Sequence, residues 1–121
     1  MHFSHMAIVV ENLEESIKFY ETMTELTIAR RFKEGEAELA FLSNGAGATE
    51  IELVSMPGME RLESNGKGFF VCFLTDKLEA MHKLAQEEGY KPSPIRNPDP
   101  KSRYFYVYDP SGISVQLKQK F

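Results

Sequence analysis

The feature that most constrains this 121-residue chain is an internal repeat. Both halves follow the same order of expected elements, and their apolar positions fall at equivalent places. The aligned positions are His5 with Phe70, Ala7 with Cys72, Leu13 with Leu78, Glu52 with Gln116 and Leu53 with Leu117. Neither half can bury both a sheet face and a helix stripe alone, so the two halves are expected to combine. We therefore predict one α+β domain, residues 1–121, built from modules at about 1–60 and 66–121.

Local patterns indicate where each module forms strands and helices. Asn12 and Asp76 each have a glutamate three residues later, a capping-box pattern that predicts a helix start. The sequence Asp109–Gly112 suits a β-turn with proline at its second position. Residues 91–100 contain four prolines and are expected to form an irregular loop. The expected strands are 3–10, 27–32, 37–42, 50–54, 69–74, 103–108 and 113–118.

Alternation along these strands predicts which side chains share a face of the sheet. The uninterrupted apolar faces belong under the helices, and the opposite faces carry His5, Glu52, Phe70 and Gln116 at equivalent places in the repeat. Histidine, glutamate and glutamine converging on a concave sheet would suit a divalent metal that accepts nitrogen and oxygen ligands. A hydrogen-bonded core histidine and a solvated glutamate explain the same residues without a metal.

Composition excludes several classes of function. The net charge is −4 and no Lys/Arg cluster occurs, which argues against nucleic-acid binding. No apolar stretch reaches the roughly 20 residues of a membrane-spanning helix, and the first residues lack the positive segment of a secretion signal. The single cysteine, Cys72, lies in an apolar run and predicts a buried free thiol in the reducing cytoplasm. A small molecule is the expected partner.

The whole chain resembles the vicinal oxygen chelate superfamily, which includes glyoxalase I (lactoylglutathione lyase), bleomycin-resistance proteins and extradiol dioxygenases. The residues that carry the resemblance are His5–Val10, Asn12–Glu14, Ser16, Phe19-Tyr20, Ile51–Leu53, Asp109–Gly112 and Gln116-Leu117. The resemblance implies two βαβββ modules that form a curled eight-stranded mixed sheet around an open pocket, commonly with a metal on its concave face. It also implies a homodimer.

The resemblance assigns four positions to a metal site. In glyoxalase I each of four strands provides one ligand, and a glutamate moves a proton between adjacent carbons. The first two positions are His5 and Glu52 here, while Phe70 replaces the usual histidine and Gln116 replaces the usual glutamate. Phenylalanine cannot ligate a metal, and a neutral amide is a poor ligand without useful basicity. The implied site is therefore His5, Glu52 and Gln116 around nickel or zinc, with Glu52 as the catalytic candidate.

Other residues are candidates for substrate binding. Lys101 and Arg103 could bind an anionic substrate, although solvated charges at a strand start explain them equally well. Phe70, Tyr104 and Tyr106 could line a pocket, although aromatic residues are also common as strand formers.

The leading interpretation is a glyoxalase I-like, metal-dependent lyase or isomerase. It would act on a small carbonyl or thiohemiacetal-type substrate through an enediolate. The alternative is a non-catalytic binding protein of the bleomycin-resistance type, with a pocket built from Phe70 and the tyrosines. Val9 and Met56 stand where glyoxalase I tends to place an arginine and an asparagine that grip glutathione. A dioxygenase is disfavoured because its facial triad needs the histidine that Phe70 replaces.

Overall fold

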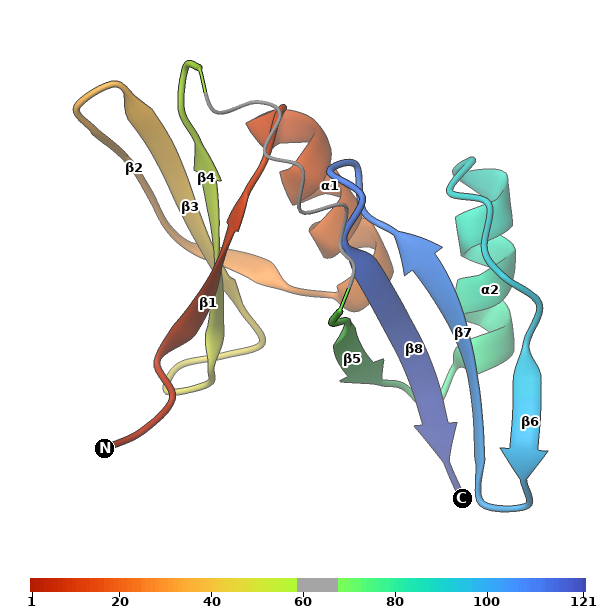
Figure 1. Ribbon diagram of the computed structural model, residues 1–121. Helices are drawn as coiled ribbons and strands as arrows, with labels where there is room; N and C mark the ends of the chain where they lie inside the picture. Colours follow the sequence, from red (N-terminus) through yellow and green to blue (C-terminus); the bar gives the residue numbers. More distant parts are fainter. Residues whose placement is uncertain (59–67) are drawn as a thin grey trace. The chain divides into compact units, whose positions relative to one another are not determined.

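The computed structural model describes residues 1–58 and 68–121 (Figure 1). The chain divides into two compact units, Met1–Glu63 and Ser64–Phe121. The first contains β1 (His5–Val9), α1 (Leu13–Thr24), β2 (Thr27–Glu34), β3 (Ala37–Ser43) and β4 (Glu50–Ser55). The second contains β5 (Val71–Leu74), α2 (Leu78–Glu87), β6 (Arg96–Asp99), β7 (Ser102–Tyr108) and β8 (Ser114–Lys120). Each unit is a βαβββ module, which confirms the predicted α+β fold class.

The eight described strands are divided between two four-stranded mixed sheets. The strand order is β1-β4-β3-β2 in the first unit and β5-β8-β7-β6 in the second. In each sheet the first strand of the module runs parallel to the last, and the other neighbours are antiparallel. The two topologies are therefore the same.

Strand register confirms the alignment of the two halves residue by residue. Ala7 lies opposite Glu52 in the first sheet, and Cys72 lies opposite Gln116 in the second. One residue further on, Ile8 faces Leu53 just as Phe73 faces Leu117. Residues aligned from sequence alone thus occupy equivalent places in the two sheets.

Each helix covers one face of its own sheet. In the first unit, α1 packs against β3 and β4 and the buried side chains include Ile17, Tyr20 and Leu53. In the second, α2 packs against β7 and β8, with Met81 and Phe105 buried. Complete burial of one such side chain contributes about 2 kcal/mol to the free energy of folding. Among residues 1–58 and 68–121, no helix lies over the opposite face of the sheet of its own unit.

The two helices begin differently. Asn12 caps α1 as predicted, because its side-chain oxygen accepts a hydrogen bond from the backbone N–H of Glu15 at 3.1 Å. The predicted cap at Asp76 is wrong. Lys77 is the N-cap residue of α2 and makes no side-chain cap, while the Thr75 hydroxyl accepts a hydrogen bond from the N–H of Lys77. A short turn one residue earlier has displaced the expected cap.

The turn before β8 is organised by one carboxylate. Asp109 Oδ1 accepts hydrogen bonds from the backbone N–H groups of Ser111 and Ile113, both at 2.8 Å. Gly112 adopts a φ of 86°, which a residue with a Cβ would adopt only under strain. The predicted turn at these residues is confirmed, and it fixes where β8 begins.

The proline-rich segment is more regular than expected. Within residues 91–100, β6 pairs with β7 through Arg96 opposite Tyr104 and Asp99 opposite Ser102. The register shifts between these two pairs. An edge strand tolerates Pro98 because the N–H groups on its outer side have no partner strand. The prediction of an irregular loop is therefore wrong for Arg96–Asp99.

The strand β2 forms the other edge of the first sheet, and all eight of its residues are exposed. An exposed edge can accept a strand from another chain. The homodimer implied by the resemblance stays a prediction, and β2 is one of the exposed edge strands that could form such a pairing, as is β6 in the second sheet. Neither described helix has the length and apolar character needed to cross a bilayer.

Candidate functional site

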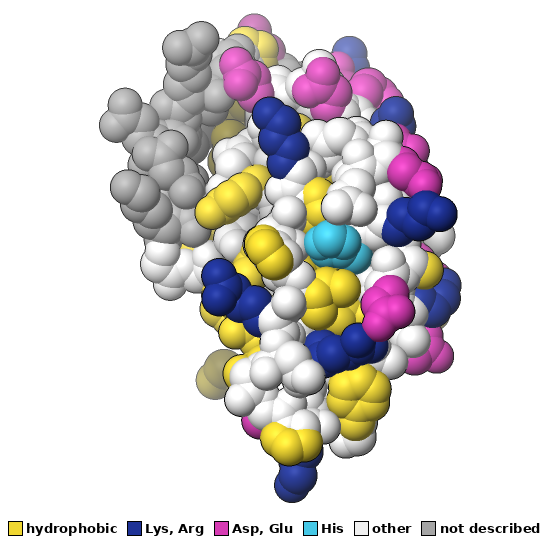
Figure 2. Space-filling view, turned by 90° about the vertical axis from the view of Figure 1, so that its right-hand side faces the viewer, with side chains coloured by type: hydrophobic (Ala, Val, Ile, Leu, Met, Phe, Trp, Pro, Cys, Tyr) yellow, Lys and Arg dark blue, Asp and Glu magenta, His cyan; other side chains and the backbone are white. Residues whose placement is uncertain are grey.

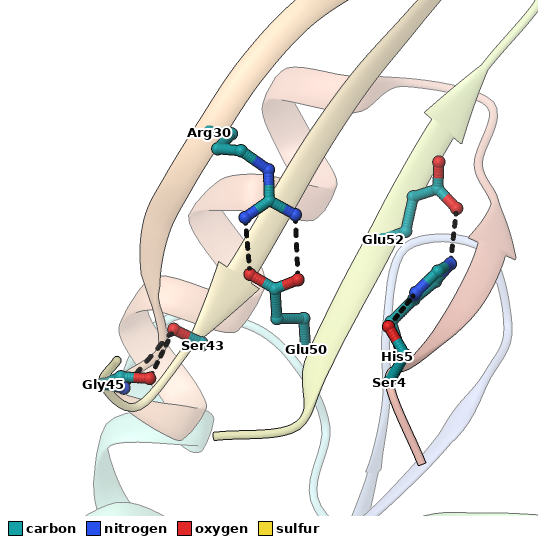
Figure 3. A network of polar contacts seen from close by, with 7 residues as sticks. All are labelled: Ser4, His5, Arg30, Ser43, Gly45, Glu50 and Glu52. Atoms are coloured by element: carbon teal, nitrogen blue, oxygen red, sulfur yellow. Dashed lines mark hydrogen bonds and ion pairs between the residues drawn. The ribbon is translucent and has the colours of Figure 1, made fainter. Parts of the chain in front are cut away.

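His5 and Glu52 meet on the open face of the first sheet (Figure 3). His5 Nε2 lies 3.5 Å from Glu52 Oε1, and the two side chains are 38% and 14% exposed. The contact is diagonal, because Glu52 on β4 lies directly opposite Ala7 on β1. On the other side of the ring, the Ser4 hydroxyl lies 2.9 Å from His5 Nδ1 and orients the imidazole. The structure therefore brings together the first two residues of the predicted site.

The neighbouring carboxylate, Glu50, is already paired. Arg30 donates two hydrogen bonds to it, at 2.9 and 2.8 Å (Figure 3). These bonds hold the pKa of Glu50 below its ordinary value and raise the pKa of Arg30. Arg30 thereby neutralises the charge of Glu50, and Glu52 is the carboxylate placed to act with His5.

Aromatic side chains surround this polar pair on the first sheet. Phe41 packs edge-on against the His5 ring with centroids 5.3 Å apart, and Phe32 stacks on Phe41 at 6.1 Å. The Arg30 guanidinium carbon lies 4.3 Å from the Phe41 ring centroid, a cation–π contact. Sequence analysis did not name Arg30, Phe32 or Phe41. The signal was strand alternation, since Phe41 lies opposite both Glu52 and Arg30.

The open face of the second sheet is aromatic at the equivalent place. Gln116 is only 6% exposed, and its Nε2 donates a hydrogen bond to the Tyr106 hydroxyl at 3.0 Å. The Tyr106 ring packs edge-on against Phe70 and Tyr104, each with centroids 5.6 Å apart. Phe70 itself is 51% exposed. The structure thus gathers four of the predicted residues into one aromatic cluster (Phe70, Tyr104, Tyr106 and Gln116).

These residues fit a metal only in part. His5 and Glu52 offer one nitrogen and one carboxylate, a pair that suits nickel or zinc. At the equivalent positions the second unit has Phe70, with no ligand atom, and Gln116, a neutral amide whose Nε2 donates to the Tyr106 hydroxyl and whose Oε1 is only a weak metal ligand. Among residues 1–58 and 68–121, no three His, Cys, Asp or Glu side chains form a group that could hold a metal ion. The ligand set His5, Glu52 and Gln116 stays a prediction.

Neither of the two basic residues predicted for substrate binding belongs to the aromatic cluster. Arg103 is on the helix side of β7, where it donates to Glu79 Oε1 at 2.7 Å and to Gln119 Oε1 at 2.9 Å. The structure does not bring it to the aromatic cluster, because alternation along β7 turns it away from Tyr104. Lys101 lies in the turn between β6 and β7.

The prediction of a buried Cys72 is wrong, since this residue is exposed. It lies opposite Gln116, on the face of β5 that α2 does not cover. Partial shielding from water raises the pKa of the Cys72 thiol, while the charges of Lys118 and Lys120 act in the opposite direction. The apolar run therefore forms a strand whose alternate residues, Cys72 and Leu74, are exposed.

Comparison with known proteins agrees with this geometry. A family model described as the Glyoxalase/Bleomycin resistance protein/Dioxygenase superfamily matches residues 2–117. The chain belongs to this superfamily. Superfamily membership confirms the resemblance that the sequence indicated.

Individual relatives of this superfamily member differ in activity. The chain is 28% identical to a lactoylglutathione lyase of Neisseria meningitidis, over 99% of this chain and 91% of the relative. A glyoxalase family protein from Bacillus cereus has a TM-score of 0.86 at 20% identity, covering 100% of this chain and 95% of the other. An antibiotic-binding protein from a Streptomyces species has a TM-score of 0.78 at 20% identity, covering 100% and 97%. The fold is shared by a lyase and a binding protein, so the site must distinguish between them.

We predict that the hydroxyl of Tyr106 holds Gln116 in place. Tyr106→Phe should lower the free energy of unfolding by about 1 kcal/mol, because it leaves a buried amide without its partner. Tyr104→Phe is the matched control and should change it by less than about 0.5 kcal/mol, since its hydroxyl makes no hydrogen bond within the described residues. Urea denaturation measures both. Equal effects of the two variants would contradict the role of this hydrogen bond.

Proposed function

We propose that this superfamily member binds a small organic molecule with an aromatic or apolar body. The observation that carries the proposal is the aromatic cluster of Phe70, Tyr104, Tyr106 and Gln116. The resemblance to glyoxalase I implies a basic glutamate at position 116. This chain has Gln116 there, a buried, neutral amide that donates a hydrogen bond to Tyr106. Such a group can donate or accept a hydrogen bond but cannot remove a proton from carbon.

The exposed aromatic rings supply the binding energy in this proposal. Phe70 and Tyr104 present rings beside Tyr106 on a face that α2 does not cover. Contact with a second aromatic ring is worth about 0.5–1.5 kcal/mol beyond the area it buries. A few such contacts, with one or two hydrogen bonds for orientation, are typical of small-molecule sites.

On the first unit, His5 and Glu52 offer polar groups of the kind that orient a ligand. The imidazole is oriented by Ser4, and Glu52 Oε1 is a hydrogen-bond acceptor 3.5 Å from His5 Nε2. A ligand hydroxyl or amide N–H would suit this pair. The neighbouring rings of Phe41 and Phe32 suit an apolar portion of a ligand that binds on this sheet.

The neutral fluorophore N-phenyl-1-naphthylamine tests this proposal. We expect saturable binding, seen as a rise in fluorescence, that weakens about threefold to tenfold in Phe70→Ala and in Tyr104→Ala. Phe3→Ala is the control, because Phe3 is 69% exposed and lies outside the cluster. The absence of saturable binding, or a loss no larger than in Phe3→Ala, would refute the proposal.

A glyoxalase I-like lyase or isomerase is the second candidate. The His5–Glu52 pair and the 28% identity to a lactoylglutathione lyase favour it. A divalent nickel or zinc ion would be held by His5 and Glu52, with Gln116 as the predicted third ligand, and when bound would polarise a substrate oxygen. Glu52 would be the residue that moves a proton on a small carbonyl or thiohemiacetal-type substrate.

Nickel binding tests the predicted contribution of His5, and turnover distinguishes the two candidates. We expect nickel to raise the melting temperature slightly by binding the native state, and His5→Ala to abolish the rise. His2→Ala, a change near the exposed end of the chain, should leave it intact. With methylglyoxal, glutathione and nickel, little or no lactoylglutathione should form, because no basic group occupies position 116. Robust formation of that product would contradict the binding proposal and support the second candidate.

A further inference from the structure

We propose that a groove beside the β6–β7 turn binds the anionic group of the ligand, so that the ligand is an amphiphilic organic anion. The inference rests on the proposed function and specifies its ligand class. The groove has a volume of about 460 Å³, within the range of roughly 300–1,000 Å³ typical of small-molecule pockets. Its lining includes Asp99, Lys101, Ser102, Lys118, Lys120 and Phe121.

The groove concentrates positive charge on a chain that is negative overall. The net charge of the protein is −4, yet three lysines, Lys101, Lys118 and Lys120, line this one groove. None of the three forms an ion pair with a carboxylate among the described residues. Unpaired ammonium groups around a concave surface attract and orient an anion.

The one acidic side chain in the lining, Asp99, is engaged by its own turn. Its Oδ1 accepts a hydrogen bond from the backbone N–H of Lys101 at 2.7 Å, and its Oδ2 accepts one from the Ser102 hydroxyl at 3.4 Å. Asp99 therefore shapes the turn and makes no ion pair with the lysines. The positive charge of the groove is left available to a ligand.

Two lysines of the groove share a face of the sheet with the aromatic cluster. Lys118 on β8 lies directly opposite Tyr104 on β7, and Lys120 lies opposite Ser102. Alternation puts Lys118 and Lys120 on the face that carries Gln116. An anionic group held by the lysines would thus place an attached apolar body toward Tyr104 and Tyr106.

The groove also has an aromatic side chain in its lining. The Phe121 ring lines it, and the Arg103 guanidinium carbon lies 5.3 Å from the centroid of that ring. Figure 2 looks onto the side of the second unit that carries α2 and β6, which is the side of the sheet opposite to Lys118 and Lys120, and there too lysine and arginine side chains lie beside hydrophobic ones. Positive and apolar surface in such proximity suits a carboxylate, sulfonate or phosphate joined to a ring or chain.

Two fluorophores that differ by one anionic group test the proposal. The anion 8-anilinonaphthalene-1-sulfonate should bind the wild-type protein more tightly than neutral N-phenyl-1-naphthylamine. Its affinity should fall about tenfold in the double variant Lys118→Gln/Lys120→Gln and should weaken as salt is added. The affinity for the neutral fluorophore should stay the same in that variant. Lys83→Gln, on α2, removes one exposed positive charge of the same unit away from the groove and should affect neither.

The outcomes separate this inference from the proposed function. Equal affinities for the two fluorophores, or unchanged affinity of the double variant for the sulfonate, would overturn the anion site while leaving aromatic binding in place. Failure of the wild-type protein to bind either fluorophore would overturn both proposals. Displacement of the sulfonate by benzoate or by phenyl phosphate, but not by neutral benzamide, would support the anion site. The relative strength of these two competitors would show whether the site prefers a carboxylate or a phosphate.

Discussion

The site depends on the parallel pairing of the first and last strand of each module. Because β1 pairs with β4 and β5 pairs with β8 in matching register, the same places on the two open faces are filled by residues aligned in the repeat. A shift of one residue in either pairing would turn Glu52 or Gln116 under its helix. The buried alternate positions, such as Leu53 and Leu117, oppose that shift because it would expose them to water.

The two sheets have the same topology but present side chains of different chemistry on their open faces. On the first sheet the equivalent positions hold an imidazole and a carboxylate in contact, with Arg30 neutralising the neighbouring Glu50. On the second sheet they hold a phenyl ring and a buried amide, held together through Tyr106. The first arrangement suits a metal or a polar ligand group, and the second suits an apolar one. The loss of ligand atoms in one module favours binding over glyoxalase chemistry.

Strand alternation predicted more than local signals did. The sequence was enough to align the modules, to separate the covered and open faces, and to place His5 beside Glu52, since these follow from a period of two and from the repeat. The cap of α2 could not be predicted, because Thr75 and Asp76 are both capable of organising the start and the local pattern does not choose between them. The strand β6 depends on pairing with β7, which overrides the proline content of its segment.

The sequence was also insufficient to predict contacts between side chains on different strands. The exposure of Cys72, by contrast, could have been predicted, because alternation puts Cys72 on the same face as Phe70, and the apolar composition of the run was given more weight than this alternation. The Arg30–Glu50 pair and the ring contact between His5 and Phe41 depend on the register of β2, β3 and β4. The lysine groove likewise joins residues of the β6–β7 turn to residues of β8.

We predict that Phe70 and Gln116 occupy ligand positions, where a phenyl ring and a neutral amide keep the second module from contributing to a metal site. Calorimetric titration with nickel tests it on the wild-type protein, Phe70→His, Gln116→Glu and the double variant. We expect each single change to tighten nickel binding. The double variant should bind about tenfold or more tightly than the wild type, because added ligands couple through the shared ion. Identical affinities in all four proteins would contradict the assignment of Phe70 and Gln116 to ligand positions.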